Sequence, residues 1–297
     1  MELRTLRYFL EVAREENMTE AANVLHVTQP TLSRQIAALE QELGCTLFIR
    51  TNRSTTLTED GMRLRQRSEE ILALVEQTED EVGAGAELTG NIRIGAGESF
   101  AMQLVTDAFA ELHAVHPRIT CEFSTGNADA IEERLERGLI DFAVVLDPFN
   151  VDKYEHLELP ATERVGLILR RDNPLAGRKA IVPDDLRGMD LLASSRTTHQ
   201  TYDLPAWSEE ALTPDDYTIV GRFDMIGNAE RLVRSGFANA VSIEGVTAPD
   251  LAFVPFDPPI MTGAHLIWKK FRLLTKTSEA FLDEMRSLIE EGSATRP

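Results

Sequence analysis

Cysteine is scarce in this 297-residue chain, which contains only Cys45 and Cys121. Two cysteines are too few for a disulfide framework, and no Cys-x-x-Cys pair or Cys/His cluster indicates a zinc site. Both have apolar neighbours in the sequence, so we expect them to be buried and unreactive. Among the histidines only His113 and His116 are spaced to share a helix face, and we expect both to be surface residues. We therefore predict neither a metal nor a cofactor.

Long hydrophobic runs are also missing. No apolar stretch is long enough to span a bilayer, and the first residues, MELRTLRYFL, mix charges with apolar side chains. We therefore expect no signal peptide, no membrane segment and a cytoplasmic location.

Positive charge is deficient, with 30 Lys and Arg against 49 Asp and Glu and a net charge of −19. This balance argues against a general polyanion binder. The deficit is uneven, because residues 1–58 contain six arginines, no lysine and seven carboxylates, for a net charge near −1. Arginine suits planar, bidentate contacts better than lysine does. The N-terminal segment thus differs in charge from the acidic remainder.

Three helices are predicted within the first 44 residues. The first covers roughly residues 2–15, because its apolar residues have helical spacing: Leu3, Leu6, Leu10 and Ala13. Thr19 is expected to cap a second helix over residues 19–26. A third begins after its cap, Thr28, and ends at Gly44. One stripe of the third helix is apolar and should face the other two: Leu32, Ile36, Leu39 and Leu43.

The first half of the third helix carries polar groups that point away from this stripe. Two helices joined by a tight turn, with a polar front on the second, make a helix-turn-helix. Such a helix places its N-terminal residues against base edges in the major groove of DNA. A solvated helix face is the simpler explanation of polar residues alone, but this spacing favours DNA. The predicted contacts are Thr28, Gln29, Pro30, Thr31, Ser33, Arg34 and Gln35.

A wing is predicted after the third helix. Two short strands, over residues 47–50 and 55–58, flank a turn. Arg50 and Arg53 lie near its tip, where we expect them to contact phosphates or the minor groove. Residues 1–58 are therefore predicted to form a winged helix-turn-helix domain.

A long helix is predicted over residues 59–82, with Thr58 as its cap. Its apolar positions are spaced by alternating fours and threes, which is typical of a coiled-coil seam weakened by Ser68 and Thr78. The alternative is a helix that packs only on its own domain. With the glycine-rich stretch that follows, residues 59–89 form the predicted linker and dimerisation segment. The residues expected at the dimer contact are Leu64, Ile71, Val75 and Val82.

From residue 90 onward the pattern alternates between strands and helices, which predicts an α/β region with largely parallel sheets. Strands are expected at residues 91–96, 119–124, 141–146, 164–170, 190–195, 217–223, 239–243, 251–256 and 265–270. Helices are expected to begin near Ser99, Asn127, Pro183, Thr198, Ile226 and Thr277. Residues 90–297 should form an effector domain of two lobes, the first built from 90–161 and 265–297 and the second from 162–264.

A ligand cleft is predicted where strands end and helices begin, because ligands of parallel α/β lobes bind at this edge. Helix N-termini and Arg196 would favour a small carboxylate or another anion, whereas Glu98 argues for an amine or hydroxyl group as well. Taken singly, each Ser or Asn here is a plain N-cap. The residues expected around the effector are Gly97, Glu98, Ser99, Phe100, Thr125, Gly126, Asn127, Ser195, Arg196, Thr197, Met225 and Asn228.

Three motifs in the N-terminal block make the chain recognisable: QPTLSRQI, LEQELG and the wing pattern LF-x-R-x-x-R. With them the chain resembles the LysR-type transcriptional regulators over essentially its full length. The resemblance implies a winged helix-turn-helix, a long dimerisation helix and two α/β lobes like those of a periplasmic binding protein. It also implies double-stranded DNA with an inverted repeat, a small-molecule effector, RNA polymerase and further copies of the chain as partners, in a dimer or a tetramer.

Three alternatives to an effector-responsive regulator stay open. An enzyme on the α/β lobes would need a nucleophile with its base, a metal set or paired carboxylates, and we identify none in a convincing context. A redox-responsive regulator would use Cys121. An architectural DNA-binding protein would have a cleft that takes no ligand.

Overall fold

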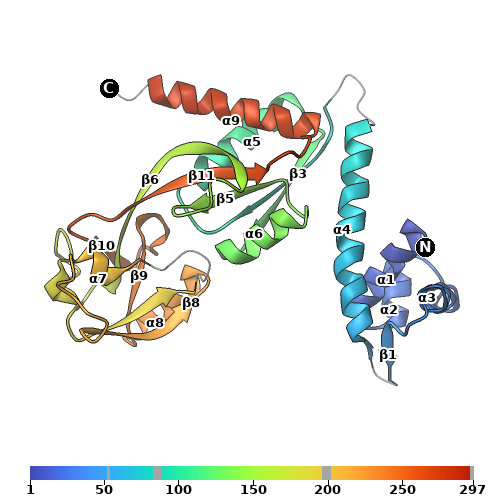
Figure 1. The fold of residues 1–297 in the computed structure, drawn as a ribbon, viewed down its shortest axis with the longest axis horizontal. Helices are drawn as coiled ribbons and strands as arrows, with labels where there is room; N and C mark the ends of the chain where they lie inside the picture. Colours follow the sequence, from blue (N-terminus) through green and yellow to red (C-terminus); the bar gives the residue numbers. More distant parts are fainter. Residues whose placement is uncertain (52–53, 83–87, 196–201, 295–297) are drawn as a thin grey trace. The chain divides into compact units, whose positions relative to one another are not determined.

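The computed structural model describes residues 1–51, 54–82, 88–195 and 202–294, and it divides the chain into two compact units (Figure 1). The first unit comprises residues 1–84 and the second residues 85–297. Within the described residues, no helix has the length and apolar character needed to cross a membrane.

The first unit is a winged helix-turn-helix followed by a long helix, as predicted. Its elements are α1 (Leu3–Glu15), α2 (Met18–Val24), α3 (Gln29–Leu43), β1 (Phe48–Arg50), β2 (Thr55–Leu57) and α4 (Glu59–Val82). The strands β1 and β2 pair antiparallel as the wing. Gly44 adopts a left-handed φ of 68° and ends α3, since glycine takes this conformation without steric cost.

The predicted apolar faces need correction at two leucines. Leu3 and Leu43 are each 42% exposed, so neither belongs to the core. Both lie in an end turn of their helix, at the start of α1 and at the end of α3. The core of this unit instead uses the middle of each helix and the start of the wing: Tyr8, Phe9, Val12, Ala13, Met18, Ala21, Ala22, Leu32, Ile36, Leu39, Leu47 and Phe48.

The cap of α2 is Asn17 rather than Thr19. Its side-chain oxygen accepts hydrogen bonds from the backbone N–H groups of Thr19 and Glu20, at 2.8 and 3.3 Å. These bonds satisfy two of the free donors at a helix start, so α2 begins and ends earlier than predicted. Thr28 does stand at the N-cap of α3, but its hydroxyl bonds to the Thr31 hydroxyl instead of the backbone.

The wing and α4 are held against one another at Thr58 and Gly61. The hydroxyl of Thr58 accepts a hydrogen bond from Gly61 N at 3.0 Å, which confirms Thr58 as the cap of α4. A Cβ at position 61 would stand 2.2 Å from the Leu47 carbonyl oxygen, so only glycine fits. This close approach places the base of the wing against the first turn of α4.

The second unit contains nine strands and seven helical segments among the described residues. The strands are β3 (Gly90–Ala96), β4 (Ile119–Thr125), β5 (Phe142–Leu146), β6 (Tyr154–Arg170), β7 (Met189–Ser194), β8 (Tyr217–Phe223), β9 (Asn239–Ile243), β10 (Leu251–Pro255) and β11 (Met261–Lys269). The helices are α5 (Met102–Val115), α6 (Ala128–Glu136), η1 (Pro183–Leu186), α7 (Leu204–Trp207), α8 (Ile226–Arg234), η2 (Glu244–Val246) and α9 (Lys276–Ala294).

The strands form one sheet in the order β4-β3-β5-β11-β6-β9-β7-β8, with β10 paired to β6. Within each lobe the neighbours β4-β3-β5 and β8-β7-β9 are parallel, as predicted. All four pairs made by β6 and β11 are antiparallel, so the expectation of largely parallel sheets holds for only half of the pairs. We call the part around β3, β4, β5, α5, α6 and α9 lobe I, and the part around β7 to β10 and α8 lobe II; β6 and β11 join them.

The first half of β6, from Tyr154 to Glu163, was not predicted. Its pairing with β11 jumps from Leu159 to Thr162, so Pro160 and Ala161 lie in a bulge. Proline has no N–H to donate to a sheet, and a bulge is one of the few strand positions that tolerate it. Because this half of β6 contains polar residues and a proline, its sequence pattern does not indicate a strand, although β6 is 17 residues long.

Helix starts also differ from expectation in three places. The helix expected near Ser99 begins at Met102, and the one expected at Pro183 is a single 3₁₀ turn. The one expected near Thr198 lies outside the described residues; the next helix along, α7, begins at Leu204.

Both faces of the lobe I sheet are covered, because side chains of a strand alternate between its faces. Phe142 and Val144 cluster with residues of α5 and α9, whereas Ala143 and Val145 cluster with residues of α6. Figure 1 shows α5 and α9 on one side of the strands and α6 on the other. The lobe is therefore a three-layer structure with a rigid central sheet.

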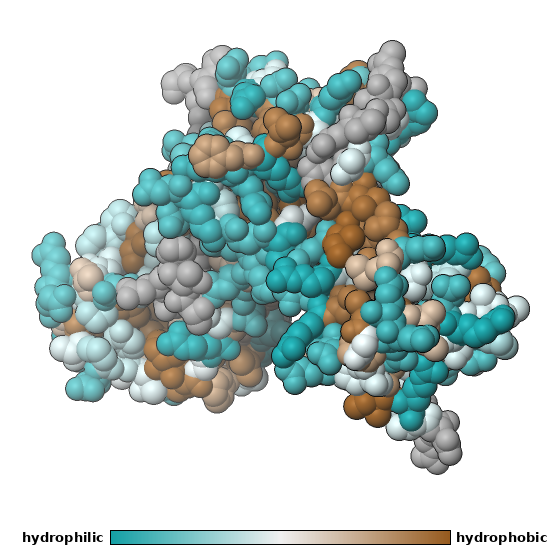
Figure 2. All heavy atoms as spheres, turned by 45° about the vertical axis from the view of Figure 1, so that its right-hand side comes forward, coloured by the Kyte–Doolittle hydropathy of each residue, from teal (hydrophilic) through white to brown (hydrophobic). Residues whose placement is uncertain are grey.

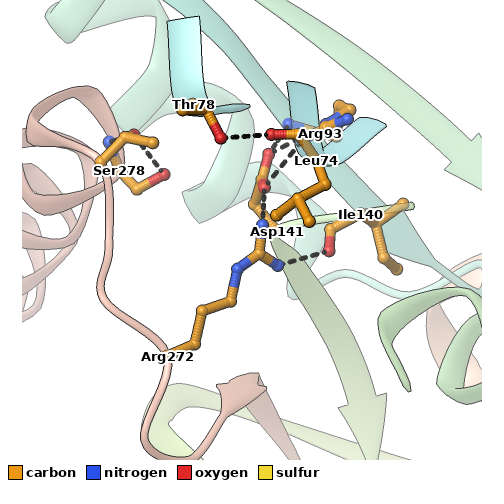
Figure 3. A network of polar contacts seen from close by, with 8 residues as sticks. Leu74, Thr78, Arg93, Ile140, Asp141, Arg272 and Ser278 are labelled. Carbon is orange, nitrogen blue, oxygen red and sulfur yellow. Dashed lines mark hydrogen bonds and ion pairs between the residues drawn. The ribbon is translucent and has the colours of Figure 1, made fainter. Parts of the chain in front are cut away.

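A buried ionic network fastens this sheet to the segment that follows β11 (Figure 3). Asp141, which is 6% exposed, accepts hydrogen bonds from the backbone and guanidinium of Arg93, and from Arg272 at 3.1 Å. Arg272 also donates to the Ile140 carbonyl oxygen. The single carboxylate thus joins β3, the start of β5 and the connection to α9.

Candidate functional site

The polar face of α3 is open to solvent. Gln29, Arg34 and Gln35 are exposed, while the opposite face, with Leu32 and Ile36, is completely buried. Arg34 makes one long hydrogen bond, 3.3 Å from its Nε to the carbonyl oxygen of Pro30 one turn earlier. The helix is therefore anchored on one side and presents unsatisfied hydrogen-bonding groups on the other.

The wing is coupled to α3 through Glu40 and Arg50. One oxygen of Glu40 accepts from the backbone N–H groups of Leu47 and Phe48, at 2.8 and 3.3 Å. The other lies 3.5 Å from the guanidinium of Arg50, which also donates to the Ser33 hydroxyl at 3.3 Å. The start of β1 is thereby set at a defined place beside the recognition face.

The structure brings most of the predicted α3 and wing residues onto one surface. Thr28, Pro30 and Arg50 are exposed, and Thr31 and Ser33 are half-buried at its border. Arg53 lies outside the described residues. Every side chain on this surface can donate or accept a hydrogen bond except that of Pro30, which occupies the first turn.

The seam of the long helix α4 is partly buried and partly exposed, so it has features of both expectations: packing on its own domain and contact with a partner helix. Ser68 is completely buried, and α4 as a whole is in contact with α1. Ile71 and Val75 are half-buried, Leu74 is 63% exposed, and hydrophobic side chains gather along the helix in Figure 2. The side chain of Val82 is not among those described.

A cavity of about 170 Å³ lies between the two lobes of the second unit. It is formed by the carboxyl ends of β3, β5 and β9 and by the segments that lead into α5, α6 and α8. Its lining residues are Gly97, Glu98, Ser99, Gly126, Asn127, Ala128, Val144, Val145, Leu146, Asp147, Ser194, Tyr202, Phe223, Asp224, Met225, Ile226, Val241, Ser242 and Ile243.

Two hydrogen bonds cross this cavity from one lobe to the other. A carboxylate oxygen of Glu98 in lobe I accepts from Ile226 N, at the first turn of α8, at 3.0 Å. The side-chain amide of Asn127 in lobe I donates to Asp224 of lobe II at 3.2 Å. The lobes are therefore clasped together by side chains that also line the cavity.

The wall of the cavity contains further hydrogen-bonded carboxylates. Asp147 accepts from Gly263 N and from the His265 ring, both at 3.2 Å. Ser99 donates to Glu163 at 2.6 Å, and Glu163 also accepts from Phe100 N at 3.0 Å. Glu163 is 2% exposed, and its second oxygen has no hydrogen-bond partner in the described part of the chain. The cleft is thus rich in carboxylates that are already bonded within the protein.

Six of the twelve predicted effector residues line the cavity: Gly97, Glu98, Ser99, Gly126, Asn127 and Met225. Four others do not line it, namely Phe100, Thr125, Ser195 and Asn228. Arg196 and Thr197 lie outside the described residues. The hydroxyl of Ser195 nevertheless bonds to Asp224, so it supports the wall from behind.

The described residues contain no cluster of three or more His, Cys, Asp or Glu side chains arranged to hold a metal ion. His113 bonds through Nδ1 to the Ile119 carbonyl oxygen. Cys45 and Cys121 are half-buried rather than fully buried as expected, and burial raises the pKa of the Cys121 thiol above its ordinary value.

Comparison with known families agrees with both units. The model of the bacterial regulatory helix-turn-helix protein, lysR family, matches residues 3–62, and the model of the LysR substrate binding domain matches residues 85–289. The chain belongs to the LysR family. It is a DNA-binding transcriptional regulator with a substrate-binding domain.

Similar regulators support this assignment. The "Probable RuBisCO transcriptional regulator" of Trieres chinensis is 30% identical over 247 residues, which cover 80% of this chain and 79% of that protein. The HTH-type transcriptional regulator BudR of Raoultella terrigena is 27% identical over 95% of this chain and 99% of its own length. The crystal structure of CbnR, a LysR family transcriptional regulator, has the same fold, with a TM-score of 0.75 at 23% identity over 97% of this chain and 99% of that one.

The lining residues that sequence reasoning missed come chiefly from two strands of this LysR regulator. Val144 to Asp147 end β5, and Val241 to Ile243 end β9. Both strands were predicted, and ligands of α/β lobes bind at the carboxyl ends of strands. The predicted effector residues lie instead at the turns that follow β3, β4, β7 and β8, so the apolar wall of the cleft was not predicted.

Proposed function

We propose that α3 reads base edges in the major groove of double-stranded DNA, and that Arg50 and Arg53 of the wing contact its backbone. The observation that carries this proposal is the exposed polar face of α3 opposite a completely buried apolar face. Arginine can contact guanine bidentately and glutamine can contact adenine bidentately. Arg34, Gln29 and Gln35 supply these side chains within the first half of the helix. A structure of the similar regulator CbnR has been solved with its target DNA.

We propose further that two copies of the chain pair through α4. The exposed Leu74 beside half-buried Ile71 and Val75 supports this pairing, because isolated apolar stripes on a long helix are usually covered by a partner helix. Val82 extends the same stripe in the sequence, whereas Leu64, also predicted at the dimer contact, is partly buried against the core of its own unit. A two-fold dimer would present two copies of α3 to an inverted repeat. Assembly of two dimers and contact with RNA polymerase are part of the same proposal.

The cavity between the lobes is proposed as the effector site. A ligand that binds one lobe arrangement more tightly than another shifts the population toward it. The two hydrogen bonds that clasp the lobes support this coupling, because a ligand in the cavity contacts the side chains that make them. Lobe movement would then alter the spacing of the two recognition helices on DNA.

The alternatives are less well supported. The similar proteins are transcriptional regulators, which favours a binding role over catalysis for the cleft. For a redox response through Cys121, a raised thiol pKa is the wrong direction, since the thiolate is the reactive form. A cavity with an apolar wall favours a ligand site over a purely architectural protein.

The test is fluorescence anisotropy on the intergenic DNA upstream of the protein's own gene, with a scrambled duplex as control and over a series of salt concentrations. Arg34→Ala should abolish most of the preference for the native duplex, a loss of about 1–3 kcal/mol of discrimination. Arg34→Lys is the matched control, since it keeps the charge but loses the bidentate geometry. We expect Arg34→Lys to lose discrimination as well.

Equal, weak and steeply salt-dependent binding of the wild-type protein to both duplexes would contradict base reading by α3. If Arg34→Lys instead behaves like the wild-type protein, Arg34 contacts phosphate, and the reading of bases falls to Gln29 and Gln35.

A further inference from the structure

The described wall of the cleft is acidic. Three of its residues are carboxylates, Glu98, Asp147 and Asp224, and none of the lining residues in the described part of the chain is Lys, Arg or His. A fourth carboxylate, Glu163, is buried directly behind Ser99. An anion entering this cavity would meet three like charges at short range, two of them, Glu98 and Asp224, on side chains that are exposed to solvent.

The helix ends that could bind an anion are already used by the protein. The first turn of α8 has Glu98 on Ile226 N, and the turn before α5 has Glu163 on Phe100 N. Asn127 caps α6 with its own side-chain oxygen, on Ala130 N at 2.9 Å. Because free N–H groups are what make a helix start an anion site, each bond to a side-chain oxygen of the protein leaves one donor fewer for an anion.

The carboxylates, by contrast, keep acceptor capacity. Glu98 bonds to Ile226 through only one of its two oxygens, Oε2. Both described bonds of Asp224 use Oδ1. A carboxylate can accept about four hydrogen bonds, so Glu98 Oε1 and Asp224 Oδ2 remain to receive donors in the part of the chain described here. Glu98 belongs to lobe I and Asp224 to lobe II, so a ligand group that donates hydrogen bonds to both oxygens would bridge the lobes.

Apolar side chains form a large part of the remaining wall, beside the polar Ser99, Asn127, Ser194, Tyr202 and Ser242. Leu146, Phe223 and Ile243 are among the apolar side chains that face the cavity. Its volume of about 170 Å³ is close to the roughly 150 Å³ of an apolar cavity known to hold benzene. The ligand should therefore have an apolar body about as large as a six-membered ring.

From these observations we propose that the effector is a small apolar amine, whose ammonium group is bound by Glu98 and Asp224 and whose body fills the apolar part of the cleft. This inference rests on the proposed effector role of the cleft, and it replaces the anion expected from the sequence. An ammonium group carries three donors and a positive charge, which match the unused oxygens on the two lobes.

The test is isothermal titration calorimetry on the full-length protein with two amines, benzylamine and isopentylamine, and the carboxylates of the same size, benzoate and isovalerate. We expect at least one amine to bind and neither carboxylate to bind. Glu98→Gln and Asp224→Asn keep a side-chain oxygen for the existing bonds and remove only the charge. Each should weaken amine binding about tenfold or more, as loss of a charge-assisted hydrogen bond does.

Two exposed carboxylates outside the cleft provide matched controls. Glu133→Gln and Asp283→Asn remove the same charges from residues whose side chains are 68% and 75% exposed, and they should leave amine affinity unchanged. Circular dichroism of all four variants checks that they are folded.

Three results would overturn the inference: binding of a carboxylate without an amine, amine binding unaffected by either cleft variant, or no binding of any of the four probes. DNA binding of the same samples without ligand is measured in parallel. A protein that binds its operator but no amine refutes the ligand class alone, whereas loss of operator binding refutes the proposed function.

Discussion

The recognition face of α3 and the cleft between the lobes hold their polar groups in opposite ways. On α3 the side chains of Gln29 and Gln35 extend into solvent, and Arg34 makes only one long bond. In the cleft, Glu98 of lobe I accepts a hydrogen bond from Ile226 N of lobe II, and Asn127 of lobe I donates one to Asp224 of lobe II. A partner of α3 therefore meets side chains with few bonds inside the protein, whereas a ligand of the cleft meets side chains that already join the two lobes.

Charge separates the two regions as well. Residues 1–58 have a net charge near −1 with only arginine as the cation, and the remainder carries nearly all of the −19. An acidic unit is repelled by DNA phosphates, so this charge difference favours DNA binding through the small unit that carries α3. The comparison predicts that the two units can be disturbed separately.

The largest effect is expected from Asp141→Ala in the second unit. The change leaves the guanidinium groups of Arg93 and Arg272, which are 12% and 16% exposed, without their carboxylate. Breaking a buried ion pair in this way costs about 3–5 kcal/mol of unfolding free energy. Both tryptophans, Trp207 and Trp268, lie in this unit, so the urea midpoint of tryptophan fluorescence measures its stability.

The control for this variant is Asp283→Ala, which removes a carboxylate whose pair with Arg286 is exposed. It should change the unfolding free energy by about 0.5 kcal/mol or less. Operator binding by folded Asp141→Ala should match that of the wild-type protein. Loss of DNA affinity in the folded variant would show that the units are not independent.

A smaller change in unfolding free energy is expected from two leucine substitutions within α3. Leu39→Ala removes a side chain that is 1% exposed and should cost about 2–5 kcal/mol of unfolding free energy in the first unit. Leu43→Ala, at a leucine that is 42% exposed in the last turn of the same helix, should cost about 1 kcal/mol or less. Helical circular dichroism during urea unfolding gives both values. Equal costs would restore Leu43 to the core, as the apolar stripe first predicted.

The smallest effect is expected at Cys121 of β4. Burial raises the pKa of its thiol, which lowers the fraction of reactive thiolate at neutral pH. Cys121→Ser should therefore leave operator binding unchanged, both before and after treatment with hydrogen peroxide. A wild-type response to peroxide that the serine variant lacks would revive the redox-responsive alternative.

Local signals predicted the elements well where the pattern was strong. The apolar positions Leu32, Ile36 and Leu39, the left-handed Gly44 and the capping Thr58 each behave as expected. Prediction failed where long-range pairing overrides local preference. The first half of β6 looks like a polar loop with a proline, yet pairing with β11 turns it into a strand with a bulge.

The sequence by itself determined the family, the winged helix-turn-helix and the exposed polar face of α3, because these depend on contacts between residues close together in the chain. Only the tertiary structure decided the character of the cleft. Glu98 and Ile226 are 128 positions apart, and Ser99 and Glu163 are 64 apart. Whether a helix start is free for an anion or already holds a carboxylate depends on such distant partners, and no local pattern reports them.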